Sequence, residues 1–111
     1  MEKWKPIKNF EGLYEISTLG RIKSCQRVIK CKNGTFKTIK EKVLKPGNGK
    51  YGRNQYTLCK EGKKYTVRGY YIVAQTFLPN PKNYIEVNHK DGNNLNDCLE
   101  NLEWISTEEN I

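Results

Sequence analysis

Hydrophobic and polar side chains alternate along much of the first 68 residues, which is the pattern of strands that bury one face. The alternating runs are Leu13–Ser17, Arg21–Ser24, Gln26–Cys31, Gln55–Cys59 and Lys64–Val67. Asn33-Gly34 lies between Arg27–Lys32 and Thr35–Lys40, and Glu61-Gly62 lies between Gln55–Cys59 and Lys64–Val67, so both pairs favour hairpin turns. Pro46-Gly-Asn-Gly49 breaks the alternation and predicts a loop. We therefore expect an antiparallel β unit with one polar, basic face.

The pattern changes after residue 68. The elements expected there are, in order, a short helix over Gly69–Phe77, a strand over Tyr84–Val87, a long polar loop, a second strand near Glu100–Trp104 and a helix opening at the capping box Ser106-Thr-Glu-Glu109. Pro79 stops the first helix, and the last is expected to be truncated because the sequence stops at Ile111. The predicted fold class is α+β, with a basic β-rich unit at 1–68 and a smaller unit at 69–111.

Charge is distributed unevenly along the chain. Residues 1–70 contain 18 Lys and Arg against 5 Asp and Glu, a net charge of +13, and residues 71–111 contain 2 against 7, a net charge of −5. A field as positive as that of the first part is typical of proteins that bind polyanions such as DNA. We therefore assign nucleic-acid binding to the first part and the candidate chemistry to the second.

The apolar runs indicate the cellular compartment of the chain, and the cysteines indicate whether it can bind zinc. No apolar run approaches the length of a membrane span or a signal-peptide core, so we expect a soluble, cytoplasmic protein. Cys25, Cys31, Cys59 and Cys98 contain no C-x-x-C pair and match no common zinc spacing. Reduced thiols are the simpler interpretation. A structural zinc site using Cys25, Cys31 and a third cysteine stays open, because sequence spacing does not fix spatial proximity.

The segment with the most chemical information contains the only histidine, His89. The strand predicted before it ends on Asn88 and His89, and Lys90-Asp-Gly-Asn93 follows as a tight turn, because Gly92 supplies a positive φ. A lone histidine more often packs or faces solvent than catalyses. Its position between a strand end and a polar loop predicts a ring that both water and a ligand can reach.

This segment resembles the core of the HNH endonucleases, in particular the phage and intron homing type. The matching positions are Asn88, His89, Asp91, Gly92, Asn93, Asn96, Asn101, Leu102, Trp104 and Asn110. A second stretch, from Trp4 to Ser24, resembles the modular DNA-binding motif often found ahead of such nuclease cores. With Val73–Asn80, the likeness covers most of the chain. The fold that it implies for the second unit is the ββα-metal fold.

The resemblance implies hydrolysis of a DNA phosphodiester with a divalent metal ion. His89 would be the general base that accepts a proton from the attacking water. Asn88 and Asn110 would be the metal ligands, and their oxygen atoms suit a hard ion such as Mg²⁺ or Mn²⁺. Asn101 would form hydrogen bonds across the loop and hold His89 in orientation. The bland interpretation of Asn101 is that it only closes the loop.

Four basic residues are the best candidates for contacts with DNA. Arg21 and Lys23 share one strand face within the resembled motif, and Arg53 and Arg68 flank the second hairpin. Such side chains contact phosphates or read a groove. Solvated strand faces account for many of the chain's other basic residues.

A catalytically degenerate HNH scaffold is the alternative prediction. Neutral Asn88 and Asn110 form a ligand set without formal charge, and the helix expected to carry Asn110 is truncated. A chain of this kind would bind DNA without cutting it. It could instead bind a host nucleoprotein complex and block it, as an anti-CRISPR factor does. An RNA-binding β protein fits the charge but leaves the residues around His89 unexplained.

Overall fold

The computed structural model describes residues 1–49 and 52–106, and its element order confirms the α+β fold class. The elements are β1 (Trp4–Pro6), β2 (Tyr14–Ser17), β3 (Ile22–Ser24), β4 (Arg27–Lys30), β5 (Phe36–Ile39), β6 (Lys42–Val43), β7 (Gly47–Asn48), β8 (Asn54–Lys60), β9 (Lys63–Arg68), α1 (Gly69–Phe77), β10 (Glu86–His89), the 3₁₀ turn η2 (Leu99–Asn101) and β11 (Leu102–Ile105). Every strand pair is antiparallel.

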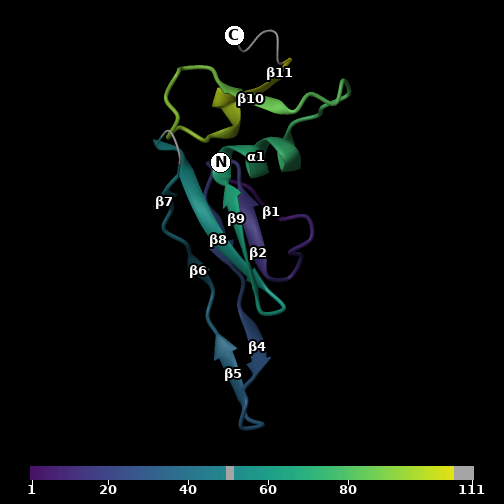
Figure 1. Ribbon diagram of the computed structural model, residues 1–111, viewed down its shortest axis with the longest axis vertical. Coiled ribbons are helices and arrows are strands. Elements are labelled where there is room, and N and C mark those ends of the chain that lie inside the picture. Colours follow the sequence, from purple (N-terminus) through teal and green to yellow (C-terminus); the bar gives the residue numbers. More distant parts are fainter. Residues whose placement is uncertain (50–51, 107–111) are drawn as a thin grey trace.

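Within the described residues, the strands form four small sheets. Their orders are β1-β2-β3-β6, β7-β8-β9, β4-β5 and β10-β11. The molecule is elongated, with extents of 54 × 27 × 24 Å. The β4–β5 hairpin lies at one end of the long axis, the β10–β11 hairpin lies at the other, and α1 lies beneath β10 and above the N-terminal sheets (Figure 1).

Local sequence signals predicted most of these elements. Helix α1 spans the expected Gly69–Phe77, and both predicted hairpins form. Glu61 and Gly62 have φ angles of 52° and 77°, as a two-residue hairpin turn requires. The loop predicted at residues 46–49 is wrong in part, because Gly47 and Asn48 pair with β8 as an edge strand. β1 and β6 have three and two residues, too few for an alternation to mark.

One hydrophobic core joins the two parts of the chain. Its fully buried side chains include Ile16 and Ile22 from the first sheet, Leu58 from β8, Val73 from α1 and Leu102 from β11. Phe10, Tyr14 and Trp104 pack in or against this cluster. The proposed division between residues 68 and 69 therefore separates two parts that share a core, and it stays a prediction about function.

The helix predicted to begin at Ser106-Thr-Glu-Glu109 and the predicted ligand Asn110 fall on residues 107–111, outside the described residues. Within the described ranges, no helix has both the length and the apolar character needed to cross a bilayer.

Candidate functional site

His89 is the last residue of β10, where it pairs with Leu102 of β11. Its side chain points into the molecule, and its ring centroid lies 5.0 Å from that of Tyr70 on α1. Only 3% of the side chain is exposed. The strand-end position agrees with the sequence, but the expectation of an openly accessible ring is wrong. The cause is tertiary packing, because α1 covers the face of β10 that carries His89.

The buried ring has a charged partner that sequence reasoning missed. His89 Nε2 lies 2.9 Å from Oδ1 of Asp97, whose side chain is 2% exposed. The second carboxylate oxygen of Asp97 accepts a hydrogen bond of 3.1 Å from Nδ2 of Asn54, which begins β8. A buried carboxylate is costly unless such bonds satisfy it. The two partners therefore hold Asp97 in place and give His89 a defined orientation.

Two glycines make room for the Asp97 carboxylate. A Cβ atom on Gly20 would lie 2.7 Å from Asp97 Cβ, and one on Gly69 would lie 3.0 Å from Asp97 Oδ2. Gly69 opens α1, and the N-terminal end of a helix favours a nearby negative charge. The site is thus assembled from four segments of the chain, around residues 20, 54, 69 and 89–97. One weak signal for this site was present in the sequence: a carboxylate eight residues after the only histidine, in a loop otherwise rich in amides.

Asn101 organises the loop between β10 and η2 and does not contact the His89 ring. Its Nδ2 donates to Asp91 Oδ1 and to the carbonyl oxygen of Asn96, both at 2.9 Å. Its Oδ1 accepts from the backbone N–H of Asp91 at 3.1 Å. Hydrogen bonds from Asn96, Asn93 and Asn101 lower the pKa of Asp91 below its ordinary value. Any effect of Asn101 on His89 therefore passes through the loop backbone.

Asn88 lies on the other face of β10, because neighbouring residues in a strand point to opposite sides. Its Nδ2 donates to Oε2 of Glu103, its partner on β11, at 3.1 Å. The amide oxygen of Asn88 and the carboxylate of Glu103 are hard donors, so their chemistry fits Mg²⁺ or Mn²⁺. Within residues 1–49 and 52–106, no three His, Cys, Asp or Glu side chains form a metal-binding group. The second predicted ligand, Asn110, lies outside these ranges.

The cysteines give no support to the zinc alternative. Cys25, Cys31, Cys59 and Cys98 are all free thiols. All four lie in the described part of the chain, where no three His, Cys, Asp or Glu side chains lie close enough together to hold a metal ion. Burial raises the pKa of the Cys25 thiol, which favours its protonated form.

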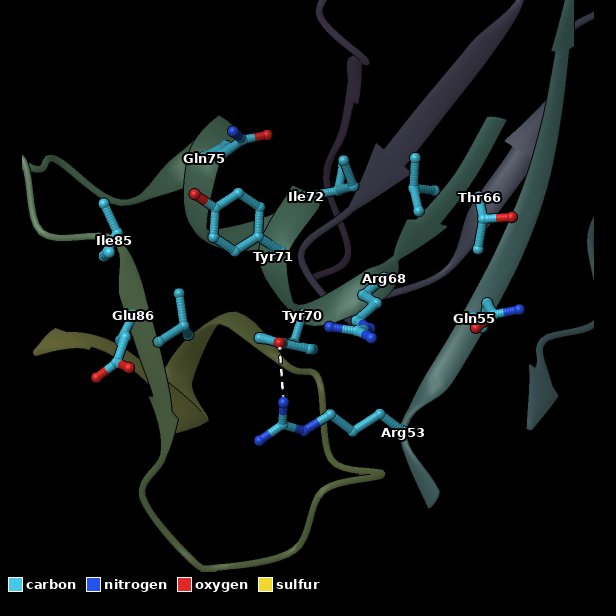
Figure 2. Close-up of a pocket in the computed structure, with 12 residues that line it drawn as sticks. Arg53, Gln55, Thr66, Arg68, Tyr70, Tyr71, Ile72, Gln75, Ile85 and Glu86 are labelled. Atoms are coloured by element: carbon cyan, nitrogen blue, oxygen red, sulfur yellow. Dashed lines mark hydrogen bonds between the residues drawn. The ribbon is translucent and has the colours of Figure 1, made fainter. Parts of the chain in front are cut away.

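Arg53 and Arg68 line a pocket of about 640 Å³ next to the buried histidine. Figure 2 shows both guanidinium groups approaching Tyr70, from the start of β8 and the end of β9. Arg53 Nη1 donates to the Tyr70 hydroxyl at 3.0 Å, and its guanidinium lies 4.9 Å from the ring centroid. Since the Tyr70 ring also contacts His89, this tyrosine separates the pocket from the imidazole.

Arg21 and Lys23 have acidic partners within the chain. Arg21 forms a bidentate ion pair with Glu2, and this hydrogen bonding lowers the pKa of Glu2 from 4.5 to about 2. Lys23 Nζ lies 3.5 Å from Glu15 and 3.3 Å from Glu41. Both cations also lie over the ring of Trp4. Of the four predicted DNA contacts, these two have their charge partly neutralised by the protein itself.

Comparison with known proteins agrees with the sequence resemblance. A family profile described as the NUMOD4 motif matches residues 2–59. The DNA endonuclease I-HmuI of Bacillus phage SP01 is 34% identical over 109 residues, which cover 98% of this chain and 55% of that protein. The uncharacterized HNH endonuclease L245 of Acanthamoeba polyphaga mimivirus is 38% identical over 108 residues, 97% of this chain and 28% of that protein.

The fold comparison points to the same relative. A solved structure described as DNA binding and cleavage by the HNH homing endonuclease I-HmuI matches with a TM-score of 0.76 and 33% identity. The match covers 97% of this chain and 55% of that one. This chain therefore spans about half the length of the phage relative and a smaller share of the mimivirus one.

Proposed function

The chain belongs to the HNH homing endonuclease family and carries its NUMOD4 motif, and from this premise we propose that it hydrolyses DNA phosphodiester bonds with His89 as general base. The observation that supports this best is the buried hydrogen bond between His89 and Asp97. Any buried imidazole needs a hydrogen-bond partner. A partner that is a carboxylate, itself held by Asn54, also keeps the ring in one orientation and would stabilise its protonated form, as a general base requires.

The hydrogen bond supports an assignment of the ring nitrogen that acts as the base. Asp97 is a hydrogen-bond acceptor when ionised, so Nε2 of His89 carries the proton and donates it to Oδ1. Nδ1 then keeps its lone pair, and it forms no hydrogen bond to any residue within the described ranges. Nδ1 is therefore the atom that accepts the proton of the attacking water. The Asp97 carboxylate stabilises the imidazolium that results.

We propose that Asn88, joined by Glu103, supplies oxygen ligands for a divalent ion, with Asn110 as a further ligand. When bound, Mg²⁺ or Mn²⁺ would stabilise the charge that develops on the leaving oxygen. The Asn88 amide and the Glu103 carboxylate supply only two oxygen ligands to the metal ion, and their total charge is low. DNA phosphate oxygens would complete the coordination, so we expect the metal to bind more tightly in the presence of DNA.

The pocket beside Tyr70 is our proposed place for the DNA backbone. Arg53 and Arg68 both reach it, and neither forms an ion pair with an acidic side chain in the described part of the chain. A phosphate that bound Arg53 would compete with the Tyr70 hydroxyl for the guanidinium. Because Tyr70 lies between the pocket and His89, release of this hydrogen bond is the step that would admit water and the phosphate to the ring.

A non-cutting DNA-binding protein is the second candidate function. Two observations favour it: the 3% exposure of the His89 side chain and the neutral amide of Asn88 in the proposed metal site. This candidate keeps the positive field and the arginines of the pocket but lacks turnover.

Relaxation of supercoiled plasmid separates the two candidates. We expect nicking in Mg²⁺ or Mn²⁺, none in EDTA, and none with His89→Ala. Lys90→Ala is the matched control, because Lys90 is the exposed neighbour of His89 and should leave nicking unchanged. Nicking that persists at the same rate in His89→Ala would reject the catalytic assignment. DNA binding without nicking by the unmodified chain would establish the second candidate.

A further inference from the structure

The β4–β5 hairpin projects from the body of the molecule. We call residues 27–40 the basic arm. Its two strands pair only with each other, and the hairpin extends beyond the other sheets at one end of the long axis (Figure 1). A two-stranded hairpin with no sheet or helix behind it is marginally stable in water. A protruding element of this kind is better explained by a partner that covers it than by a role in the fold.

The arm is strongly positive. It contains Arg27 and four lysines but no acidic residue, so its net charge is +5 within a chain of net charge +8. The lysines are Lys30, Lys32, Lys37 and Lys40, and all four are exposed. None of them forms an ion pair with a residue in the described part of the chain. Their charge is fully available, in contrast with that of Arg21 and Lys23.

The arm also exposes large apolar side chains between its cations. Phe36 is 70% exposed and Val28 is 63% exposed. The strand register pairs Phe36 with Lys30 and Val28 with Thr38, so these four residues lie on one face of the ribbon. On such a face, the apolar groups can contact base edges and thymine methyl groups while the cations contact the phosphates at either side.

The root of the arm is fixed to the body. Arg27 Nη1 lies within hydrogen-bond distance of the carbonyl oxygens of Leu13 and Cys25 and of Ser24 Oγ, at 3.0 to 3.2 Å. Its guanidinium also lies 5.5 Å from the centroid of the Tyr14 ring, in the buried core. The direction of the arm is therefore set before any partner binds, which lowers the entropic cost of binding.

We propose that the basic arm inserts into a groove of duplex DNA and is a principal anchor of this protein on its substrate. The inference rests on the proposed function in one respect: the polyanion is the DNA on which the His89 site acts. A major groove about 12 Å wide admits a two-stranded ribbon. The 54 Å long axis corresponds to about 16 base pairs at roughly 3.4 Å each. Since the arm and β10 lie at opposite ends, the anchor is separated from the bond that is cut (Figure 1). A second copy of the chain is a poorer occupant, because two arms of +5 repel.

The test compares two variants with the same loss of charge. The arm variant is Lys30→Gln, Lys32→Gln and Lys37→Gln, and the control is Lys63→Gln, Lys64→Gln and Lys82→Gln, which are all exposed and lie outside the arm. Binding to a random-sequence duplex of about 30 base pairs is measured by fluorescence anisotropy in EDTA, over a range of salt concentrations. Phe36→Ala is measured in the same way, because its exposed ring contributes nothing to the core.

For the arm variant we expect about tenfold weaker binding or more, and a salt-dependence slope reduced by about 2 to 3, at roughly 0.9 per lost phosphate contact. The control should change both quantities much less. Equal effects in the two variants would overturn the proposal, because net charge alone would then explain binding. Loss of self-association in sedimentation of Phe36→Ala, with DNA affinity unchanged, would also overturn it in favour of a second copy.

The catalytic proposal is tested by a separate measurement, the rate of nicking. The Lys63→Gln, Lys64→Gln and Lys82→Gln control should keep the single-turnover nicking rate of the unmodified chain, because these exposed lysines lie outside both the arm and the His89 site. If the unmodified chain binds through the arm but never nicks, the arm proposal stands and the endonuclease proposal fails. If nicking depends on His89 while the arm variant binds DNA normally, the endonuclease proposal stands and the arm proposal fails.

Discussion

Replacing Asp97 by Asn tests the proposed chemistry most directly, because it keeps the shape of the side chain and removes its charge. An asparagine can turn its NH₂ group toward Nε2 of His89 and donate to it. Nε2 would then become the acceptor, and the proton would move to Nδ1. The nitrogen that must accept a proton from water would thereby be blocked, although the ring would keep its place.

The magnitude follows from the buried hydrogen bond. A bond of 2.9 Å between two side chains that are at most 3% exposed is charge-assisted, and such bonds contribute about 1.5 to 3 kcal/mol. Reversal of the donor reduces the active tautomer by about 10- to 100-fold. Loss of the carboxylate that stabilises the imidazolium costs a similar factor again. We therefore expect the single-turnover nicking rate to fall by about 10² to 10⁴, the usual contribution of a general base.

Two measurements check this prediction. His89 is the only histidine, so the ¹⁵N NMR signals of the imidazole report its tautomer without assignment. We expect the proton on Nε2 in the unmodified chain and on Nδ1 in Asp97→Asn. Glu100→Gln is the charge-matched control, because Glu100 is exposed in the same part of the chain and should alter neither the tautomer nor the rate. An Asp97→Asn variant with the original tautomer and the original nicking rate would refute the reasoning.

Two further predictions concern stability. Gly20→Ala should lower the free energy of unfolding, measured by urea titration, by about 2 to 4 kcal/mol, because its Cβ would lie 2.7 Å from Asp97 Cβ at a φ of +85°. Gly12→Ala is the control, because Gly12 has a similar φ of +82° but no atom within 4 Å of the added Cβ. An equal loss of stability in Gly12→Ala would show that backbone strain alone is responsible. Glu2 has a pKa lowered from 4.5 to about 2, so its pairing with Arg21 stabilises the fold above pH 4.5 and is lost as the pH falls toward 2. The unmodified chain should therefore melt at a higher temperature than Glu2→Gln near neutral pH, and the two melting curves should converge at low pH; a difference that persists at pH 2 would contradict this assignment.

Local signals in the sequence predicted most of the elements, whereas the contacts between them were not predictable. The bounds of α1 and the two hairpins followed from proline, glycine and alternation, which act over a few residues. Gly47 and Asn48 were expected in a loop because nothing in their own sequence shows that β8 offers them a free edge. A strand of two residues depends entirely on its partner.

The same distinction holds for the candidate site. The motif identified His89, Asn88 and Asn101 because their spacing is local. Asp97 escaped notice because its importance comes from Asn54, 43 residues earlier, and from His89 on a neighbouring strand. Arg21 and Lys23 were chosen for their charge, and their acidic partners became visible only when the sheet aligned them. Sequence reasoning thus named candidate residues but missed the side chains that pair with them in the structure.

The close approach of Gly20 to Asp97 has a consequence for how such proteins diversify. Gly20 belongs to the N-terminal motif, whereas Asp97 pairs with His89 of β10, and the space between the Gly20 and Asp97 Cβ positions leaves no room for a larger residue. Recombination that joins the front of one gene to the back of another must keep a small residue at the first position whenever the second carries this carboxylate. A larger residue at position 20 would need a compensating change on the Asp97 side of the contact, so we expect these two positions to change together.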